Sequence, residues 1–194
     1  MIDLFNYLDL YLMNHLSAAF IYGADNPPEL LKSIAIFCAK YLCLSVPIYC
    51  IIMLLNPNFK IIKIGLVPLL IRLSSATILS AVLSYMIGTC FYRVRPFISH
   101  PDINLISHSA SASFPSNHAM FFAVFLYFII KYRADIAYSK IGIPIIIVCT
   151  VLTCWARVFV GVHYPLDIVG GLILGVFCAF FSDKIFSRFY LGVR

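Results

Sequence analysis

Three short stretches hold nearly all of the side chains in this 194-residue chain that could do chemistry. They are residues 92–97 (YRVRPF), 113–118 (SFPSNH) and 157–167 (RVFVGVHYPLD). Together they offer three guanidinium groups, two imidazoles and one carboxylate. This set suits an anion with charged oxygens, because the planar fork of arginine pairs with phosphate through two parallel hydrogen bonds. If the stretches converge, they predict a phosphate site.

The spacing of His163 and Asp167 predicts an oriented imidazole. The carboxyl lies four residues after the histidine, and one helical turn would bring it beneath a ring nitrogen. A carboxylate that holds Nδ1–H fixes the tautomer and leaves Nε2 free as a base or as a nucleophile. Attack on phosphorus by Nε2 would give a phosphohistidine that water then hydrolyses. We expect no metal ion and no cofactor, because arginines and a helix N-terminus can stabilise the transferring group.

The pair Pro115-Ser116 predicts the start of a helix, because proline and small polar residues favour helix N-termini. The free N–H groups of that first turn, including the one at Asn117, would then face an anion. His118 lies in the same turn, where it could protonate a leaving oxygen. Alone, this segment could be no more than a helix cap, and the two other stretches are what favour an active site.

The composition predicts an all-α, polytopic transmembrane helix bundle. Hydrophobic residues make up 62% of the chain and charged residues 11%, against about 45–50% and about 25% in soluble domains. Residues 1–31 carry apolar side chains at helical spacing and predict an interfacial amphipathic segment, although a deeper insertion would make it a sixth span. The rest of this single domain, residues 1–194, holds five spans near the length that crosses about 30 Å: 33–55, 64–88, 116–131, 141–160 and 166–185.

The basic residues predict how the chain is oriented in a cell inner membrane. Lysines and arginines gather in the connection before residue 64, in the connection of residues 131–140 and after residue 183, which places these three regions in the cytoplasm. The loops 89–115 and 157–165 would then face the periplasm or exterior. The first of them could form a lid over the site. Because the basic residues form no tract, we expect membrane lipids and no nucleic acid as partners.

At these residues the chain resembles the type 2 phosphatidic acid phosphatase superfamily, whose signatures are Lys-x6-Arg-Pro, Pro-Ser-Gly-His and Ser-Arg-x5-His-x3-Asp. The resemblance covers about residues 88–171, and the whole layout is similar to the bacitracin-resistance type of undecaprenyl-diphosphatase. It implies His163 as the nucleophile, Asp167 as its orienter and His118 as the general acid. The phosphate ligands that it implies are Arg95, Ser116 and Arg157.

Three departures from these signatures stand out. Gly88 occupies the position of the family lysine, Asn117 replaces glycine, and Ala156 replaces serine. We hypothesise that Lys40, inside the first span, supplies the missing cation, because an ionisable residue within a span is costly and often functional. The alternative is that it snorkels or pairs with a bound lipid. Arg93 could hold a second phosphate or anchor the chain at the membrane surface.

The residues alone predict a hydrolase of phosphoesters or phosphoanhydrides. The resemblance implies undecaprenyl diphosphate as the substrate, so that the enzyme would recycle a lipid carrier used in peptidoglycan biosynthesis. Phosphatidic acid, phosphatidylglycerol phosphate and lipid A phosphate are alternative substrates, and a lipid phosphotransferase could use the same phosphohistidine. The alternative from another class is an anion channel or transporter with an arginine selectivity ring.

Overall fold

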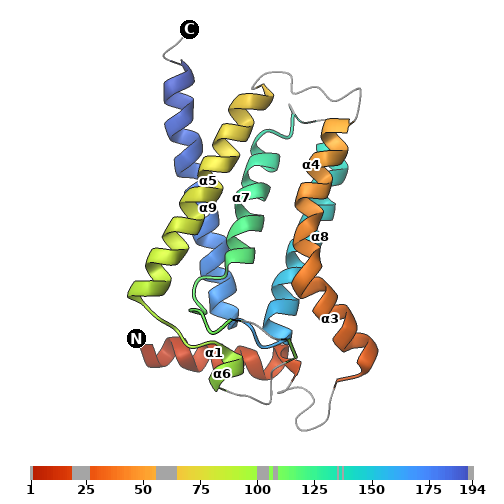
Figure 1. The fold of residues 1–194 in the computed structure, drawn as a ribbon, viewed down its shortest axis with the longest axis vertical. Coiled ribbons are helices and arrows are strands. Elements are labelled where there is room, and N and C mark those ends of the chain that lie inside the picture. Colours follow the sequence, from red (N-terminus) through yellow and green to blue (C-terminus); the bar gives the residue numbers. More distant parts are fainter. Residues whose placement is uncertain are drawn as a thin grey trace.

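The computed structural model describes residues 2–18, 27–55, 65–99, 105–106, 109–134, 136 and 138–191, and these residues form helices and no strand (Figure 1). The helices are α1 (Ile2–Leu16), α3 (Glu29–Tyr41), η1 (Leu42–Leu44), α4 (Ser45–Leu55), α5 (Leu66–Cys90), α6 (Pro96–Ser99), α7 (Asn117–Lys131), α8 (Ser139–Phe159) and α9 (Pro165–Leu191). The short 3-10 turn η1 joins α3 and α4 into one long segment.

Five of these segments correspond to the five spans expected from the sequence. Four are long and apolar enough to cross a membrane, and the fifth, α7, is a shorter apolar helix of 15 residues. The long ones are Glu29–Met53, Leu66–Cys90, Ser139–Phe159 and Pro165–Arg188. The predicted fold class is therefore confirmed, and the protein is a multi-pass membrane protein. The main differences from the expectation are the break at η1 and the extension of α9 past residue 185.

Helices α7 and α9 pack closely in the centre of the bundle because glycines of α9 face the backbone of α7. A Cβ on Gly171 would lie 2.6 Å from the carbonyl oxygen of Ser116, and one on Gly175 would lie 2.5 Å from that of Met120. No larger residue fits at either position without displacing backbone, and such small-residue contacts are typical of membrane helix pairs. The close approach brings the start of α7 beside the start of α9.

Helix α1 lies across the end of the bundle at which α7 and α9 begin, instead of running along it (Figure 1). Asp9 and Met13, one turn apart, are buried against the bundle, whereas Leu8 and Tyr11 are exposed. The exposed apolar face suits a helix that lies in a membrane interface. The face turned toward the protein carries a buried carboxylate, which is uncommon.

A buried ion-pair cluster ties three helices together at the opposite end of the bundle. Asp183 of α9 lies 3.3 Å from Nε of Arg72 on α5, contacts Nζ of Lys131 on α7, and accepts a hydrogen bond of 2.5 Å from Tyr132. Arg72 is 5% exposed and Asp183 is 1% exposed. Their charges are therefore satisfied by each other inside the bundle.

Candidate active site

The turn between α8 and α9 explains the spacing of Arg157 and His163. Gly161 takes a left-handed conformation with φ of +76°, which glycine adopts without steric cost. The chain then folds back, so that the N–H groups of Val162 and His163 both donate to the carbonyl of Arg157, at 3.0 and 3.2 Å. This closed turn sets the histidine beside the last turn of α8, next to the arginine side chain.

Nδ1 of His163 is held mainly by backbone. It lies 2.9 Å from the carbonyl oxygen of Ser113, whereas the nearest oxygen of Asp167 is 3.7 Å away. The sequence-based expectation that the carboxylate holds Nδ1–H therefore needs correction, because a carbonyl is the nearer acceptor. Asp167 instead accepts the hydroxyl of Ser113 at 2.5 Å and the N–H of Tyr164 at 2.9 Å. The carboxylate acts on the ring by charge.

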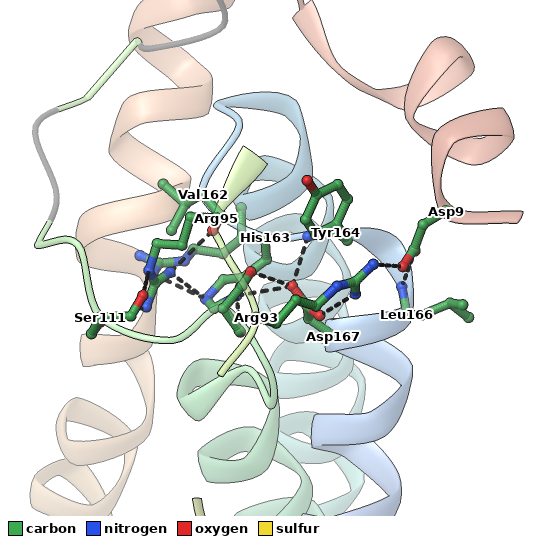
Figure 2. Close-up of polar contacts among 11 residues, drawn as sticks. Asp9, Arg93, Arg95, Ser111, Val162, His163, Tyr164, Leu166 and Asp167 are labelled. Atoms are coloured by element: carbon green, nitrogen blue, oxygen red, sulfur yellow. Dashed lines mark hydrogen bonds and ion pairs between the residues drawn. The ribbon is translucent and has the colours of Figure 1, made fainter. Parts of the chain in front are cut away.

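Two arginines converge on the other ring nitrogen. Nη1 of Arg95 and Nη2 of Arg157 each lie 3.4 Å from Nε2 of His163, as Figure 2 shows for the Arg95 side. Arg95 also donates to the carbonyls of Ser111 and Val162, both at 3.0 Å. Both arginines are 4% exposed. Two fixed cations facing one lone pair are the arrangement expected around a bound phosphate.

Burial lowers the pKa of His163 to about 4, and the charges of Arg157 and Arg95 act in the same direction. The ring is only 2% exposed. It is therefore neutral at neutral pH. With a proton on Nδ1 donated to Ser113, the lone pair remains on Nε2, where a nucleophile needs it.

The start of α7 lies beside the same turn, since the N–H of Ser116 donates to the carbonyl of Asp167 at 3.1 Å. Within the described residues the buried hydroxyl of Ser116 has no hydrogen-bond partner. The next N–H groups, from Asn117 to Ala119, have no acceptor within the helix, which begins its own hydrogen bonds at Met120. The side chain of Asn117 points elsewhere, because its Oδ1 accepts from Ser84 at 2.5 Å. His118 is half-buried in this first turn.

The role of Lys40 as the missing cation stays a prediction, because its side chain lies off the buried face of α3. Its side chain is exposed, while Ala35, Cys38 and Ala39 of the same helix are buried. Successive helical residues are rotated by about 100°, which turns Lys40 away from the face that Ala39 presents to the bundle. It is the carbonyl of Ala39 that reaches the site, where it accepts from Arg157 at 3.3 Å.

Arg93 does not face Nε2 either, so the structure does not support a role in holding a second phosphate. One end of its guanidinium donates to Oδ1 of Asp167 at 2.6 Å, and the other contacts Oδ2 of Asp9 (Figure 2). Its plane also lies over the ring of Tyr164, 4.1 Å from the centroid. The guanidinium therefore bridges two carboxylates.

A cavity of about 560 Å³ opens at Gly88, the position of the family lysine. It runs between α5 and α7 and reaches Arg95, which is the cation among the described residues that line it. Its other lining residues include hydroxyl-bearing ones such as Ser84, Thr89 and Ser111 and apolar ones such as Ala81 and Phe121. Without the lysine, space remains at position 88. Among the described residues that line the cavity, no cation other than Arg95 takes its place.

Sequence reasoning missed Asp9, Ser111 and Ser113. Asp9 could have been noticed as an acidic residue within an otherwise apolar helix, and Ser113 as a neighbour of the Pro115-Ser116 pair. The contacts made by the carbonyls of Ser111 and Ser113 cannot be inferred from residue type, because every residue has a carbonyl. Of the expected lid, residues 100–104 and 107–108 fall outside the described residues, while Ser111 and Ser113 contact the site directly.

Comparisons with known proteins identify the family to which the chain is similar. Residues 69–190 match the family model of the PAP2 superfamily. The undecaprenyl-diphosphatase BcrC of Bacillus subtilis (strain 168) is 30% identical over 187 residues, which cover 94% of this chain and 91% of that protein.

Two solved structures share the fold. LpxE of Aquifex aeolicus matches with a TM-score of 0.61 and 22% identity, covering 91% of this chain and 95% of that one. The PAP2 type phosphatidylglycerolphosphate phosphatase from Bacillus subtilis matches with a TM-score of 0.56 and 25% identity, covering 94% of this chain and 86% of that one.

Proposed function

Because this chain belongs to the PAP2 superfamily, as its motifs predicted, we propose that it is an integral membrane phosphatase that converts undecaprenyl diphosphate to undecaprenyl phosphate. The observation that carries the proposal is the convergence of Arg95 and Arg157 on Nε2 of a buried, neutral His163. A terminal phosphate held between the two guanidinium groups would meet the nitrogen lone pair directly. The substrate itself rests on the similarity to BcrC.

The proposed reaction has two steps. Nε2 of His163 attacks the terminal phosphorus, the bond from phosphorus to the bridging oxygen breaks, and His118 donates a proton to that oxygen. Water then attacks the phosphohistidine, giving up a proton to His118, and inorganic phosphate leaves. Arg95, Arg157, Ser116 and the first N–H groups of α7 stabilise the charge on the phosphoryl oxygens in both steps.

The cavity beside Gly88 supports a lipid diphosphate as the substrate. It begins at Arg95 and continues between α5 and α7 toward Thr77 and Phe121. A lysine at position 88 would occupy part of this space. Its absence leaves room for the leaving group, which consists of the second phosphate and the first part of the lipid chain, among lining residues that are mostly uncharged.

The proposed orientation places the site outside the cytoplasm. Helix α7 begins beside His163 and ends at Lys131 at the other end of the bundle, where Arg133 and Lys140 follow. The positive-inside rule assigns that basic end to the cytoplasm. The site would then face the periplasm or exterior. Arg72 gives no support to the channel alternative, because it is paired with Asp183.

The test is phosphate release by the purified protein in detergent. Undecaprenyl diphosphate, phosphatidic acid, phosphatidylglycerol phosphate and lipid A are compared in identical micelles, with and without a chelator. We expect release that is fastest from undecaprenyl diphosphate and insensitive to the chelator. Added alcohol acceptors would reveal phosphotransfer as a phosphorylated alcohol.

His163→Ala should abolish release, and alkaline quenching with labelled substrate should trap phosphohistidine in the parent alone. His15→Ala is the matched control, because His15 is an exposed histidine of α1. The proposal fails if no lipid phosphate is hydrolysed, or if His163→Ala hydrolyses as fast as His15→Ala.

A further inference from the structure

Asp9 is a buried carboxylate that the reaction proposed above does not use. It is 0% exposed although it lies on α1, a helix at the surface of the bundle. Both of its oxygens have partners: Oδ1 accepts from the N–H of Leu166 at 2.8 Å, and Oδ2 contacts Arg93. A carboxylate is rarely buried so fully unless it is paired.

One partner of Asp9 binds Asp167, and the other precedes Asp167 in the chain (Figure 2). The N–H of Leu166 belongs to the first turn of α9, where backbone donors lack a partner within the helix, and Asp167 is the next residue. Arg93 donates to Oδ1 of Asp167 at 2.6 Å. Asp9 therefore holds in place the helix turn that carries Asp167 and the guanidinium that faces it.

The charges of these three groups have a consequence for His163. Arg93 alone would cancel the negative charge of Asp167, and with it the stabilisation that Asp167 gives to a positively charged imidazole from 3.7 Å. With Asp9 present, the Asp9–Arg93–Asp167 trio carries a net charge of −1. The remaining charged groups that face the ring are Arg95 and Arg157, and both are cations.

We infer that Asp9 is a positioning residue for the hydrolysis, which acts through Arg93 to keep the Asp167 carboxylate oriented and effectively negative beside His163. The inference rests on the proposed function and extends it to α1. Helix α1 is thereby coupled to the active site, since its movement away from the bundle would remove the carboxylate of Asp9 from the trio.

The test compares Asp9→Asn, Arg93→Gln and the double variant with the parent, in detergent, on undecaprenyl diphosphate. Asparagine keeps an oxygen for the N–H of Leu166 but removes the charge. We expect kcat to fall about 10-fold with KM nearly unchanged, because Asp9 does not touch the substrate. The comparison is made at neutral pH, because burial raises the pKa of Asp9 and the trio would lose its net charge in acid.

The double variant distinguishes a role of Asp9 through its charge from a merely structural role. It restores a net charge of −1 on Asp167 alone, so its kcat should return toward that of the parent and exceed that of Asp9→Asn. A merely structural role for Asp9 would leave the double variant at least as impaired as Asp9→Asn. If Asp9→Asn does not fold, the kcat of the double variant compared with that of the parent still tests the trio.

Glu29→Gln is the matched control, because it removes an exposed carboxylate at the same end of the bundle. The inference is overturned if the active parent and Asp9→Asn share kcat, or if the double variant is no closer to the parent than Asp9→Asn. An inactive parent would instead overturn the proposed function, and this inference with it.

Discussion

The imidazole of His163 is held by the backbone of Ser113, whose carbonyl oxygen lies 2.9 Å from Nδ1. The hydroxyl of the same serine donates to Oδ2 of Asp167 at 2.5 Å. Ser113 thus joins the ring to the carboxylate: its carbonyl orients the ring, and Asp167 supplies charge from 3.7 Å. Because a carbonyl survives side-chain substitution, mutation can separate these two contributions.

Asp167→Asn should lower kcat by roughly 100-fold and leave clear residual activity above His163→Ala. The charge is lost, but the carbonyl of Ser113 still fixes the tautomer, so the loss of about 10⁴-fold that follows a wrong tautomer is avoided. Steady-state phosphate release measures both variants. Ser113→Ala, which keeps the carbonyl, should lose less than Asp167→Asn. Equal inactivity of Asp167→Asn and His163→Ala would show that the carboxylate itself holds Nδ1–H.

Arg95→Lys and Arg157→Lys should each reduce kcat/KM by roughly 10²–10³-fold. Lysine keeps the charge but has one donor group where the guanidinium of Arg95 spans Ser111, Val162 and Nε2 of His163. Arg133→Lys at the far end of the bundle is the control and should match the parent. Full activity of either site variant would argue against bidentate phosphate binding.

The pH profile of kcat/KM should keep its acid limb well below pH 6.5. Burial lowers the pKa of His163 to about 4, so the nucleophile stays deprotonated as the pH falls through the range in which an exposed histidine becomes protonated, and it is lost only near pH 4. Phosphorus NMR of the substrate alone supplies the correction for its own ionisation. A corrected limb near 6.5 would contradict a buried, neutral His163.

The helices and the motif positions could be predicted from the sequence because they depend on local patterns. Long apolar runs predict the spans. The turn at Gly161 keeps Arg157 and His163 together through hydrogen bonds between neighbouring residues, which do not depend on the rest of the fold. Contacts between distant segments could not be predicted. Asp9 and Arg93 are 84 residues apart in the chain, and backbone acceptors such as the carbonyl of Ser113 leave no trace in residue type.

Lys40 illustrates a second limit, since an apolar run places a residue at a depth in the membrane and not on a helix face. Lys40→Met should therefore keep the turnover and KM of the parent, because the side chain is exposed and its neighbour Ala39 faces the site. Phosphate release on undecaprenyl diphosphate measures this. A fall in kcat/KM greater than about 10-fold, equivalent to about 1.4 kcal/mol, would show that Lys40 reaches the substrate.

Asp183→Asn should destabilise the bundle while sparing the chemistry. Asp183 is buried, forms an ion pair with Arg72 and accepts hydrogen bonds from Lys131 and Tyr132. The substitution therefore leaves cations without their counter-charge, at a cost of about 3–5 kcal/mol. Thermal unfolding in detergent should show a Tm lower by on the order of 10 °C. Glu29→Gln, which removes an exposed carboxylate, should leave Tm unchanged.

Turnover by the folded Asp183→Asn protein at low temperature should stay near the parent value, because the cluster lies at the other end of α9 from His163. An unchanged Tm would mean that this buried cluster contributes no net stability, and a selective loss of kcat without a change in Tm would mean that it acts on the site.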